Sequence, residues 1–396
     1  MFKKVAIEQL SVGMYVEAVA ESKASGSSTK VIQKGIIKST ETIEKLGKLG
    51  ISSLIIDTAK SIGDNQQPTT HPAASPRVKK TRSFSDKLND AQAMYLRAKE
   101  LQAQAMDNIY EGKSLNLKGF VELSDEFVDS LFDDPDALLC VSMMKNKDDY
   151  LLEHSINVAL LLGAFAGYLK MPEKDVKSLI LGGFLHDIGK VKIADEILKK
   201  PGRLTPEEYQ VMQRHVEYGE AAVEGLQGLP DIARQVMLQH HEKLNGKGYP
   251  RGLDKDSISL YGKMAAIADC YDAITSTRCY KDGEVSGRAF KILLNDSGSH
   301  FDAGLVGKFI KCIGVYPVGT VVALKSGRLG IVLRRNKQNP LRPLVRVFYN
   351  LRHKHYIEAK EVDLSRAYED DEIEKSMRGE SLDIDVPKYF KEFLFS

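Results

Sequence analysis

Histidine and aspartate residues recur through the middle of this 396-residue chain at intervals that suit metal ligation. The positions His154, His186, His215, His240 and Asp269 are separated by 32, 29, 25 and 29 residues. Each interval accommodates one helix and its connection, so consecutive packed helices can each turn one ligand towards a common centre. Imidazole and carboxylate together suit iron, manganese, zinc or nickel better than calcium. The spacing therefore predicts a metal site between helices.

Two further residues extend this set. Asp187 follows His186, and a carboxylate beside a histidine ligand can bridge two metals. His241 follows His240; because neighbours on a helix point about 100° apart, one binds a metal directly while the other serves a second metal or the surroundings of the first. Taken singly, each histidine is explained as well by a buried core residue or a helix-end partner. Together, the set predicts two metals close together, an arrangement suited to cutting phosphoesters. Its seven members are His154, His186, Asp187, His215, His240, His241 and Asp269.

The elements that must position these ligands are predicted to be mainly helices. Residues 120–315 read as a run of helices, and the clearest start is a capping box of Thr205, Pro206 and Glu208 in the stretch PGRLTPEEYQVMQRHVEYGEAAVEGL. Residues 1–60 mix short β-type runs with a helical stretch and predict a small α/β module. Residues 316–396 contain β-rich segments separated by Gly, Asn and Pro, then the acidic run YEDDEIEK, expected on a solvated surface. The predicted fold class is multidomain and mainly α.

Two segments connect the first module to the helices. Residues 61–84, which include His71, are rich in Pro, Ser, Thr and Gln and predict a flexible linker. Residues 85–119 predict a helical connector, with a helix over 87–110. Its apolar residues recur at helical spacing and are expected to pack on the next domain or, alternatively, to form a homodimer with a second copy of the chain. They are Ala91, Met94, Tyr95, Ala98 and Leu101.

The composition excludes some classes of partner. A net charge of +2 gives no strong electrostatic attraction to a DNA or RNA polymer or to a membrane surface. The start of the chain does not read as a signal peptide, and the apolar stretch at 158–169 is too short to cross a bilayer, so it predicts a buried helix. The four cysteines form no CxxC pair and predict reduced thiols in a soluble, cytoplasmic protein. They are Cys140, Cys270, Cys279 and Cys312.

Several motifs resemble one known family. They are HDIGK (186–190), ILKKPGRLTPEEYQVMQRH (197–215), HHEKLNGKGYP (240–250) and DCYDAITSTRCYK (269–281). Over about residues 140–315 the chain resembles the HD-GYP family of cyclic di-GMP phosphodiesterases, a divergent branch of the HD metal-dependent phosphohydrolases. The GYP loop, Gly248, Tyr249 and Pro250, separates this family from other HD nucleotidases. Residues 1–60 more weakly resemble a small domain found ahead of HD-GYP modules.

The resemblance implies a fold, a cofactor and a reaction. It implies an HD-type helical bundle over 120–315 that binds two divalent ions, Fe or Mn before others, through the seven residues above. A hydroxide bridging the metals would attack phosphorus in line and convert cyclic di-GMP to linear pGpG and then GMP. The alternatives are a phosphodiesterase that prefers cyclic GMP-AMP, a receptor that binds a cyclic dinucleotide without cutting it, and a helical scaffold with structural histidines.

The resemblance also implies residue roles. Asp187 bridges the metals, while Lys190, Arg278 and Lys281 bind the substrate phosphate, and the GYP loop shapes the entrance for guanine. Asp272 is expected to orient a metal ligand without binding the metal itself. Three positions depart from the family pattern. Asn245 replaces a usual Asp, Cys279 replaces a usual Pro, and Tyr150 stands where members with a third metal carry Glu, so two metals are expected.

Overall fold

The computed structural model of the chain describes residues 2–22, 35–37, 39–48, 51–58, 82–143, 150–276, 283–336, 338–366 and 370–377. The chain divides into two compact units, residues 1–78 and 79–396. Most of the predicted linker, including His71, lies outside the described residues. Of the cysteines, Cys140, Cys270 and Cys312 are described, and all three are free thiols, as predicted.

The first unit is the small α/β module that the sequence predicts. Its four strands form a sheet in the order β1-β4-β2-β3, with all described pairs antiparallel. Val5, Leu54 and Ile56 form part of its own small core. The elements are β1 (Phe2–Ala6), the 3-10 helix η1 (Ile7–Gln9), β2 (Tyr15–Ser22), β3 (Gly35–Ile36), α1 (Thr40–Lys48) and β4 (Ile51–Asp57).

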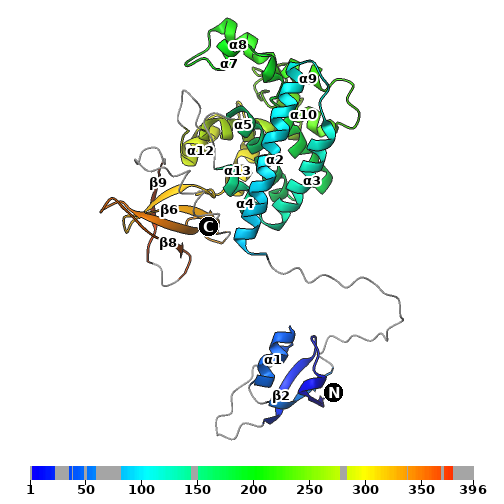
Figure 1. Ribbon diagram of the computed structural model, residues 1–396, viewed down its shortest axis with the longest axis vertical. Helices are drawn as coiled ribbons and strands as arrows, with labels where there is room; N and C mark the ends of the chain where they lie inside the picture. Colours follow the sequence, from blue (N-terminus) through cyan, green and yellow to red (C-terminus); the bar gives the residue numbers. More distant parts are fainter. Residues whose placement is uncertain are drawn as a thin grey trace. The chain divides into compact units, whose positions relative to one another are not determined.

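The second unit begins with a helical bundle (Figure 1). Its helices are α2 (Phe84–Tyr110), α3 (Leu117–Asp133), α4 (Pro135–Ser142), α5 (Tyr150–Tyr168), α6 (Glu173–Leu185), the 3-10 helix η3 (Ile188–Lys192), α7 (Asp195–Leu198), α8 (Pro206–Gln213), α9 (His215–Ala222), α10 (Asp231–Gln239), α11 (Leu260–Thr275), α12 (Ser286–Asn295) and α13 (Ala303–Ile313). A mainly α fold is therefore confirmed.

The centre of the bundle is the pair α5 and α6. Helix α5 is apolar around most of its circumference, as a helix enclosed by others must be. Helix α6 approaches it closely because Gly183 has no side chain: a Cβ there would lie 2.5 Å from the Cα of Ala159. Helix α5 is long and apolar enough to pass as a membrane span, but 78% of the relevant window is buried inside the protein, which fits a core helix.

Helix α2 lies along the bundle beside α3, α4 and α5 (Figure 1). It starts at a capping box formed by Ser83 and Asp86. Of the predicted stripe, Ala91, Tyr95 and Ala98 are buried in the core that these helices share. The stripe therefore packs on the adjoining helices of the same chain, which was the first of the two expectations, and it is not left open for a second copy.

The predicted helix that follows Leu204 is shorter than expected. The capping box of Thr205 and Glu208 forms as predicted, with Pro206 in the first turn. The helical stretch is nevertheless broken at Arg214 into α8 and α9, and no Gly or Pro marks the break. His215 thereby becomes the first residue of α9, where its ring turns back to the carbonyl of Met212 at 2.8 Å.

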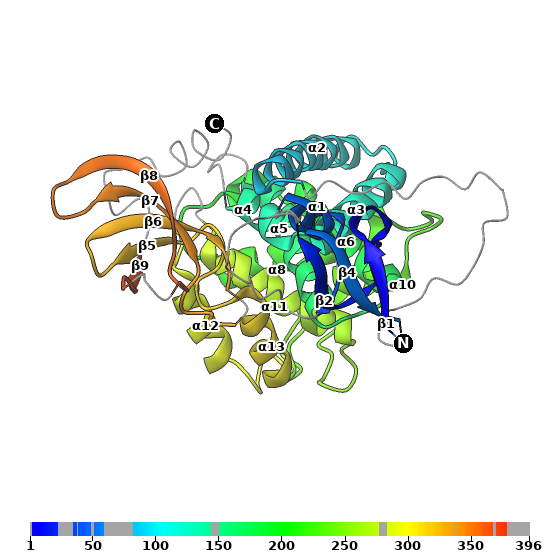
Figure 2. The same cartoon turned by 90° about the horizontal axis from the view of Figure 1, so that it is seen from below.

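The second unit ends in the β-rich region that the sequence predicts, at one side of the helices (Figure 2). Arg335 attaches this sheet to α4 through an ion pair with Asp136 of 2.5 Å. Leu329, Ile331 and Phe348 belong to the same core as the helices. The five antiparallel strands, in the order β8-β7-β6-β5-β9, are β5 (Val321–Leu324), β6 (Arg328–Arg334), β7 (Leu344–Asn350), β8 (His355–Asp363) and β9 (Ile373–Met377).

Asp370, Glu374 and Lys375 of the acidic run near the C-terminus are exposed as predicted, but one residue corrects the expectation. The run was expected to be a solvated surface, but Asp371 is buried and pairs with Arg328 at 2.8 Å. Residues of the run then form β9, which extends the sheet beside β5. The carboxylate is buried because a cation reaches it, which periodicity in the sequence does not reveal.

Candidate metal centre

The seven predicted ligands come from five places in the bundle. His154 lies in α5 and Asp269 in α11. The other five lie at helix ends: His186 caps the C-terminus of α6, Asp187 precedes η3, His215 begins α9, His240 caps the C-terminus of α10, and His241 follows it. All except His241 are at most 8% exposed.

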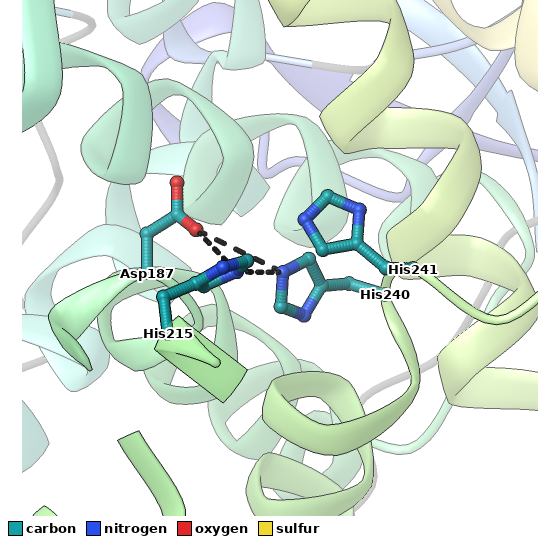
Figure 3. Close-up of side chains that lie close together, drawn as sticks. All are labelled: Asp187, His215, His240 and His241. Atoms are coloured by element: carbon teal, nitrogen blue, oxygen red, sulfur yellow. Dashed lines mark hydrogen bonds and ion pairs between the residues drawn. The ribbon is translucent and has the colours of Figure 1, made fainter. Parts of the chain in front are cut away.

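The structure brings all seven side chains together in two adjoining groups. Among the described residues, these are the sets of His, Cys, Asp or Glu whose ligand atoms come close enough to share an ion. We call them the His154 group (His154, His186 and Asp269) and the His215 group (Asp187, His215, His240 and His241). Within each group the ligand atoms lie within 4.8 Å of one another. Figure 3 shows the His215 group, with His241 beside His240.

Asp187 stands between the two groups and faces both. Its Oδ2 lies 3.5 Å from Nε2 of His154 and 3.3 Å from Nε2 of His186. Its Oδ1 lies 3.3 Å from Nε2 of His215 and 3.8 Å from Nε2 of His240 (Figure 3). One carboxylate oxygen is thus directed to each group, which is the arrangement that a metal-bridging carboxylate needs.

Three histidines are held in the tautomer that a metal requires. The Nδ1 atoms of His186, His215 and His240 lie 2.8 Å from the backbone carbonyls of Gly183, Met212 and Met237, respectively. A carbonyl only accepts hydrogen bonds, so each Nδ1 carries the proton and each Nε2 presents a lone pair to the centre.

Two buried polar atoms at the centre make no hydrogen bond within the described part of the chain: Nε2 of His186 and Oδ1 of Asp187. Buried polar atoms are rarely left in this state without a reason. Both belong to donors that bind first-row divalent ions well. The residues present therefore fit a divalent metal site.

Burial keeps the histidines of the His215 group uncharged. Desolvation lowers the pKa of His215 to about 4 and that of His241 to about 3. It also lowers the pKa of His240 well below the ordinary value, with the neighbouring His241 adding to the effect. Neutral imidazole is the form that binds a metal, so protons do not compete for these ligands near pH 7.

His154 has a different environment. Its Nε2 lies 2.9 Å from Oδ1 of Asp269, and its Nδ1 lies 2.8 Å from Oδ2 of Asp272. Burial opposes the charged ring, but hydrogen bonds with the two carboxylates raise the pKa of His154 to about 9. Ser276 in turn donates to Asp272 at 2.8 Å. In the absence of a metal, His154 is therefore an imidazolium between two carboxylates.

Lys190 contacts the centre directly. Its Nζ lies 2.5 Å from Oδ2 of Asp187. Burial alone would raise the pKa of Asp187, but the neighbouring His186 and Lys190 hold it well below the ordinary value. The sequence predicts Lys190 as a phosphate-binding residue, and in this structure its charge is directed to the carboxylate of Asp187.

The GYP loop covers one side of the His215 group. The ring of Tyr249 lies 4.6 Å from that of His241, and Pro250 follows through a cis peptide bond. Gly248 is required by close approach, since a Cβ would lie 2.4 Å from the backbone nitrogen of Lys243. The predicted loop residue Tyr249 thus lies beside a predicted ligand.

One residue that organises this loop was not predicted. Glu242 is buried, and its carboxylate accepts hydrogen bonds from the backbone nitrogens of Arg251 at 2.8 Å and Leu253 at 2.9 Å. It therefore fixes the chain that follows Pro250. Its position directly after His240-His241 was the available signal, because a charged residue close to a buried ligand must itself find partners.

Other predicted positions have separate outcomes. Arg278, Lys281 and Cys279 lie outside the described residues. Tyr150 stacks on the ring of His154, with 5.6 Å between the ring centroids. Asn245 is exposed and accepts a hydrogen bond from the backbone nitrogen of Lys247 at 3.0 Å, as a turn residue does.

Comparisons with known proteins agree with this geometry. Residues 139–305 match the HD domain family, and residues 321–369 match a KOW domain associated with the HD domain. Residues 2–120 match a domain family of unknown function. The HD match includes every one of the seven clustered residues.

Three relatives extend the comparison. A cyclic di-GMP phosphodiesterase of Pseudomonas aeruginosa is 33% identical over 384 residues, covering 94% of this chain and 91% of the relative. A cyclic di-GMP phosphodiesterase of Thermotoga maritima is 34% identical over 206 residues, covering 50% and 55% of the two chains. A 3'3'-cGAMP-specific phosphodiesterase of Vibrio cholerae is 38% identical over 154 residues, covering 39% and 30%.

The similarity to the Pseudomonas protein spans nearly the whole of both chains, and the HD match coincides with the helices that gather the His/Asp cluster. This chain therefore belongs to the HD-GYP family of HD-domain phosphodiesterases.

Proposed function

We propose that this phosphodiesterase hydrolyses cyclic di-GMP, first to linear pGpG and then to GMP, with two divalent ions held by the seven clustered residues. The observation that carries the proposal is the position of Asp187, whose two oxygens face separate groups of histidines. Family membership supports the class of reaction, and the similarity to cyclic di-GMP phosphodiesterases supports the substrate.

The ligand types support the proposed choice of metals. Five imidazoles and two carboxylates form the site, a mixture that suits Fe(II) or Mn(II) and excludes calcium as a good fit. When bound, the two ions would supply an activated water and a positive charge that stabilises the phosphoryl oxygens. Asp187 would hold the two groups at a fixed separation because each of its oxygens is directed to one of them.

The remaining residues would orient the substrate. Lys190 lies at the cluster, with 17% of its side chain exposed, so its ammonium group can turn from Asp187 to a phosphate oxygen. Burial raises the pKa of Tyr249 above its ordinary value, which keeps the phenol protonated and able to donate a hydrogen bond. Gly248 and Pro250 would shape the entrance for guanine, while Arg278 and Lys281 would bind phosphate, as the family resemblance implies.

The direct test is hydrolysis by the full chain after anaerobic purification. We expect chelation to abolish turnover of cyclic di-GMP and Mn(II) or Fe(II) to restore it, with pGpG appearing before GMP in a time course. Retention of full activity after the metals have been removed would refute the proposal. Tight binding of cyclic di-GMP by the metal-loaded protein without product would establish a receptor instead.

A second candidate is a phosphodiesterase that prefers 3'3'-cGAMP. It is favoured by the similarity to a Vibrio cholerae enzyme of that specificity, which covers the HD region. The two substrates differ in one base, so the metal cluster serves both equally. Comparing kcat/KM for the two cyclic dinucleotides separates the candidates, and we expect a preference for cyclic di-GMP of at least about tenfold.

A further inference from the structure

A polar face of α2 contacts the two helices that carry histidines of the His154 group. Tyr95, Lys99 and Gln102 are four and three residues apart, so they share one side of the helix. Each makes a hydrogen bond to α5 or α6. Tyr95 Oη donates to Asn157 Oδ1 at 3.0 Å, Lys99 Nζ to Glu153 Oε1 at 2.9 Å, and Gln102 Nε2 to the carbonyl oxygen of Phe184 at 3.0 Å.

These contacts are buried and therefore restrictive. Gln102 is fully buried, Glu153 is 3% exposed, and Asn157 is 2% exposed. A buried polar group that loses its partner is strongly disfavoured, so displacement of α2 along its axis or about it would break these bonds. The polar face thus fixes how α5 and α6 lie relative to α2.

Two of the contacts lie beside predicted ligands. Glu153 directly precedes His154 on α5. Phe184 is two residues before His186, at the C-terminal end of α6, where carbonyls lack partners within the helix. The carbonyl of Gly183 orients His186, and the next carbonyl along the chain accepts the bond from Gln102. Gln102 therefore fixes the same turn of backbone that fixes the imidazole.

The support is unequal between the two groups. His154 and His186, which α2 reaches through its neighbours, both belong to the His154 group. Helices α9 and α10, which hold His215 and His240, pack mainly on η3, α6 and α11. Helix α2 also packs on η3, but the hydrogen bonds of Tyr95, Lys99 and Gln102 given above go to α5 and α6. A disturbance of the polar face of α2 should consequently affect one group of ligands more than the other.

We propose that Lys99 and Gln102 are positioning residues that set the metal affinity of the His154 group without contacting the metal. They act through Glu153 and Phe184, which lie next to or near its histidines. The inference rests on the metal sites of the proposed function but not on the identity of the substrate. The family match of the N-terminal segment extends to residue 120 and so includes α2. A helix within that matched segment thus contacts the ligand-bearing helices.

The test uses Gln102→Met in the full-length chain. Methionine has a similar volume and no donor. Within the described residues, Oε1 of Gln102 has no hydrogen-bond partner, so the substitution removes one unsatisfied acceptor but leaves the carbonyl of Phe184 without its donor. Thermal unfolding of each variant therefore accompanies the binding measurement and shows that the variant is folded. The matched control is Gln104→Met, an exposed position on the same helix.

Each substitution is placed in two single-site backgrounds, and Mn(II) binding is titrated by electron paramagnetic resonance of the free ion. The His215→Ala background keeps the His154 group, and there we expect Gln102→Met to weaken Mn(II) binding about tenfold. The His154→Ala background keeps the His215 group, and there we expect a change of less than about twofold. Gln104→Met should change neither.

Lys99 provides an independent check. In the His215→Ala background, Lys99→Met should weaken Mn(II) binding, and Lys99→Arg should restore it because a guanidinium can also pair with Glu153. The proposal is overturned if Gln102→Met leaves binding unchanged in that background, or weakens it equally in both. A wild-type chain that bound no Mn(II) would overturn the proposed metal sites as well, which distinguishes the two failures.

Discussion

The two halves of the metal cluster use the same kinds of ligand but differ in how one histidine, His154, holds its proton. In the His215 group, His215 and His240 donate their Nδ1 protons to backbone carbonyls and stay neutral. In the His154 group, His154 lies between Asp269 and Asp272 and keeps a proton up to about pH 9. The group that pairs with Nδ1 thus decides whether a proton competes with the metal for the histidine. A carbonyl leaves the ring neutral, whereas a carboxylate favours the protonated ring.

The largest effect should come from the carboxylate that the two halves share. We expect Asp187→Asn to lose both metals and to lower phosphodiesterase activity by more than about 100-fold, the upper end of what loss of an outer partner of a ligand costs. Metal analysis and a hydrolysis assay measure this. Asp195→Asn, at an exposed carboxylate paired with Lys199, is the control. A variant that kept one full equivalent of metal would show that Asp187 serves one half only.

Removing one histidine from each half should separate them. His154→Ala should retain about one metal in the His215 group, and His215→Ala about one in the His154 group, since in each variant the unchanged half keeps all of its ligands. Metal quantification after dialysis gives the stoichiometry, and thermal unfolding shows whether each variant is folded. Loss of both metals in either folded variant would mean that the halves are one cooperative site.

The pH dependence of metal binding should also differ. Because the pKa of His154 is about 9, binding to its group must release a proton at pH 7, and affinity should rise about tenfold for each pH unit between 7 and 9. The His215 group, with pKa values of about 4 and 3 for His215 and His241, should show a nearly constant affinity over this range. Calorimetry of the two single-site variants, in buffers of different ionisation enthalpy, measures the protons released. Equal release from both would contradict the contrast.

The smallest effect concerns the stability of the metal-free protein. His215 has a folded pKa of about 4, below the ordinary 6.5, so the unfolded chain binds more protons and stability is lost as pH falls from 6.5 towards 4. His154 has a folded pKa of about 9, so its contribution is complete below pH 6.5 and is lost as pH rises through 9. Each effect is on the order of 3 kcal/mol at most.

Urea unfolding at pH 5, 6.5 and 9 checks both signs. The metal-free wild-type chain should be most stable near pH 6.5. His154→Gln should remove most of the loss on the alkaline side, and His215→Gln should reduce the loss on the acid side. A wild-type stability that rose steadily from pH 6.5 to 9 would contradict the charge assigned to His154.

The sequence predicts the composition of the cluster because ligand spacing reflects helix length. One residue per helix-plus-connection, at 154, 186, 215, 240 and 269, needs no knowledge of how the helices pack. The split into two halves was not predictable, since it depends on which side of Asp187 each ring reaches. The fold class was predictable because local signals mark the elements. Helix caps such as Thr205 mark the helices, and the sequence becomes rich in β-forming residues after residue 315.

Tertiary partners explain what the sequence did not predict. The break at Arg214 carries no Gly or Pro and is visible only once His215 has turned back to Met212. Asp371 reads as part of a solvated acidic run until Arg328, more than 40 residues earlier in the chain, is seen beside it. The polar face of α2 likewise becomes meaningful only when its partners on α5 and α6 are known.

The C-terminal ends of α6 and α10 add negative charge to the centre. Both helices finish at a ligand, His186 and His240, and the C-terminus of a helix carries about half a negative charge. Among the described residues, three carboxylates, Asp187, Asp269 and Asp272, lie there against the charges of Lys190 and the protonated His154. The metal-free centre therefore repels a phosphodiester. If the proposed function is correct, metal would therefore have to bind before the substrate.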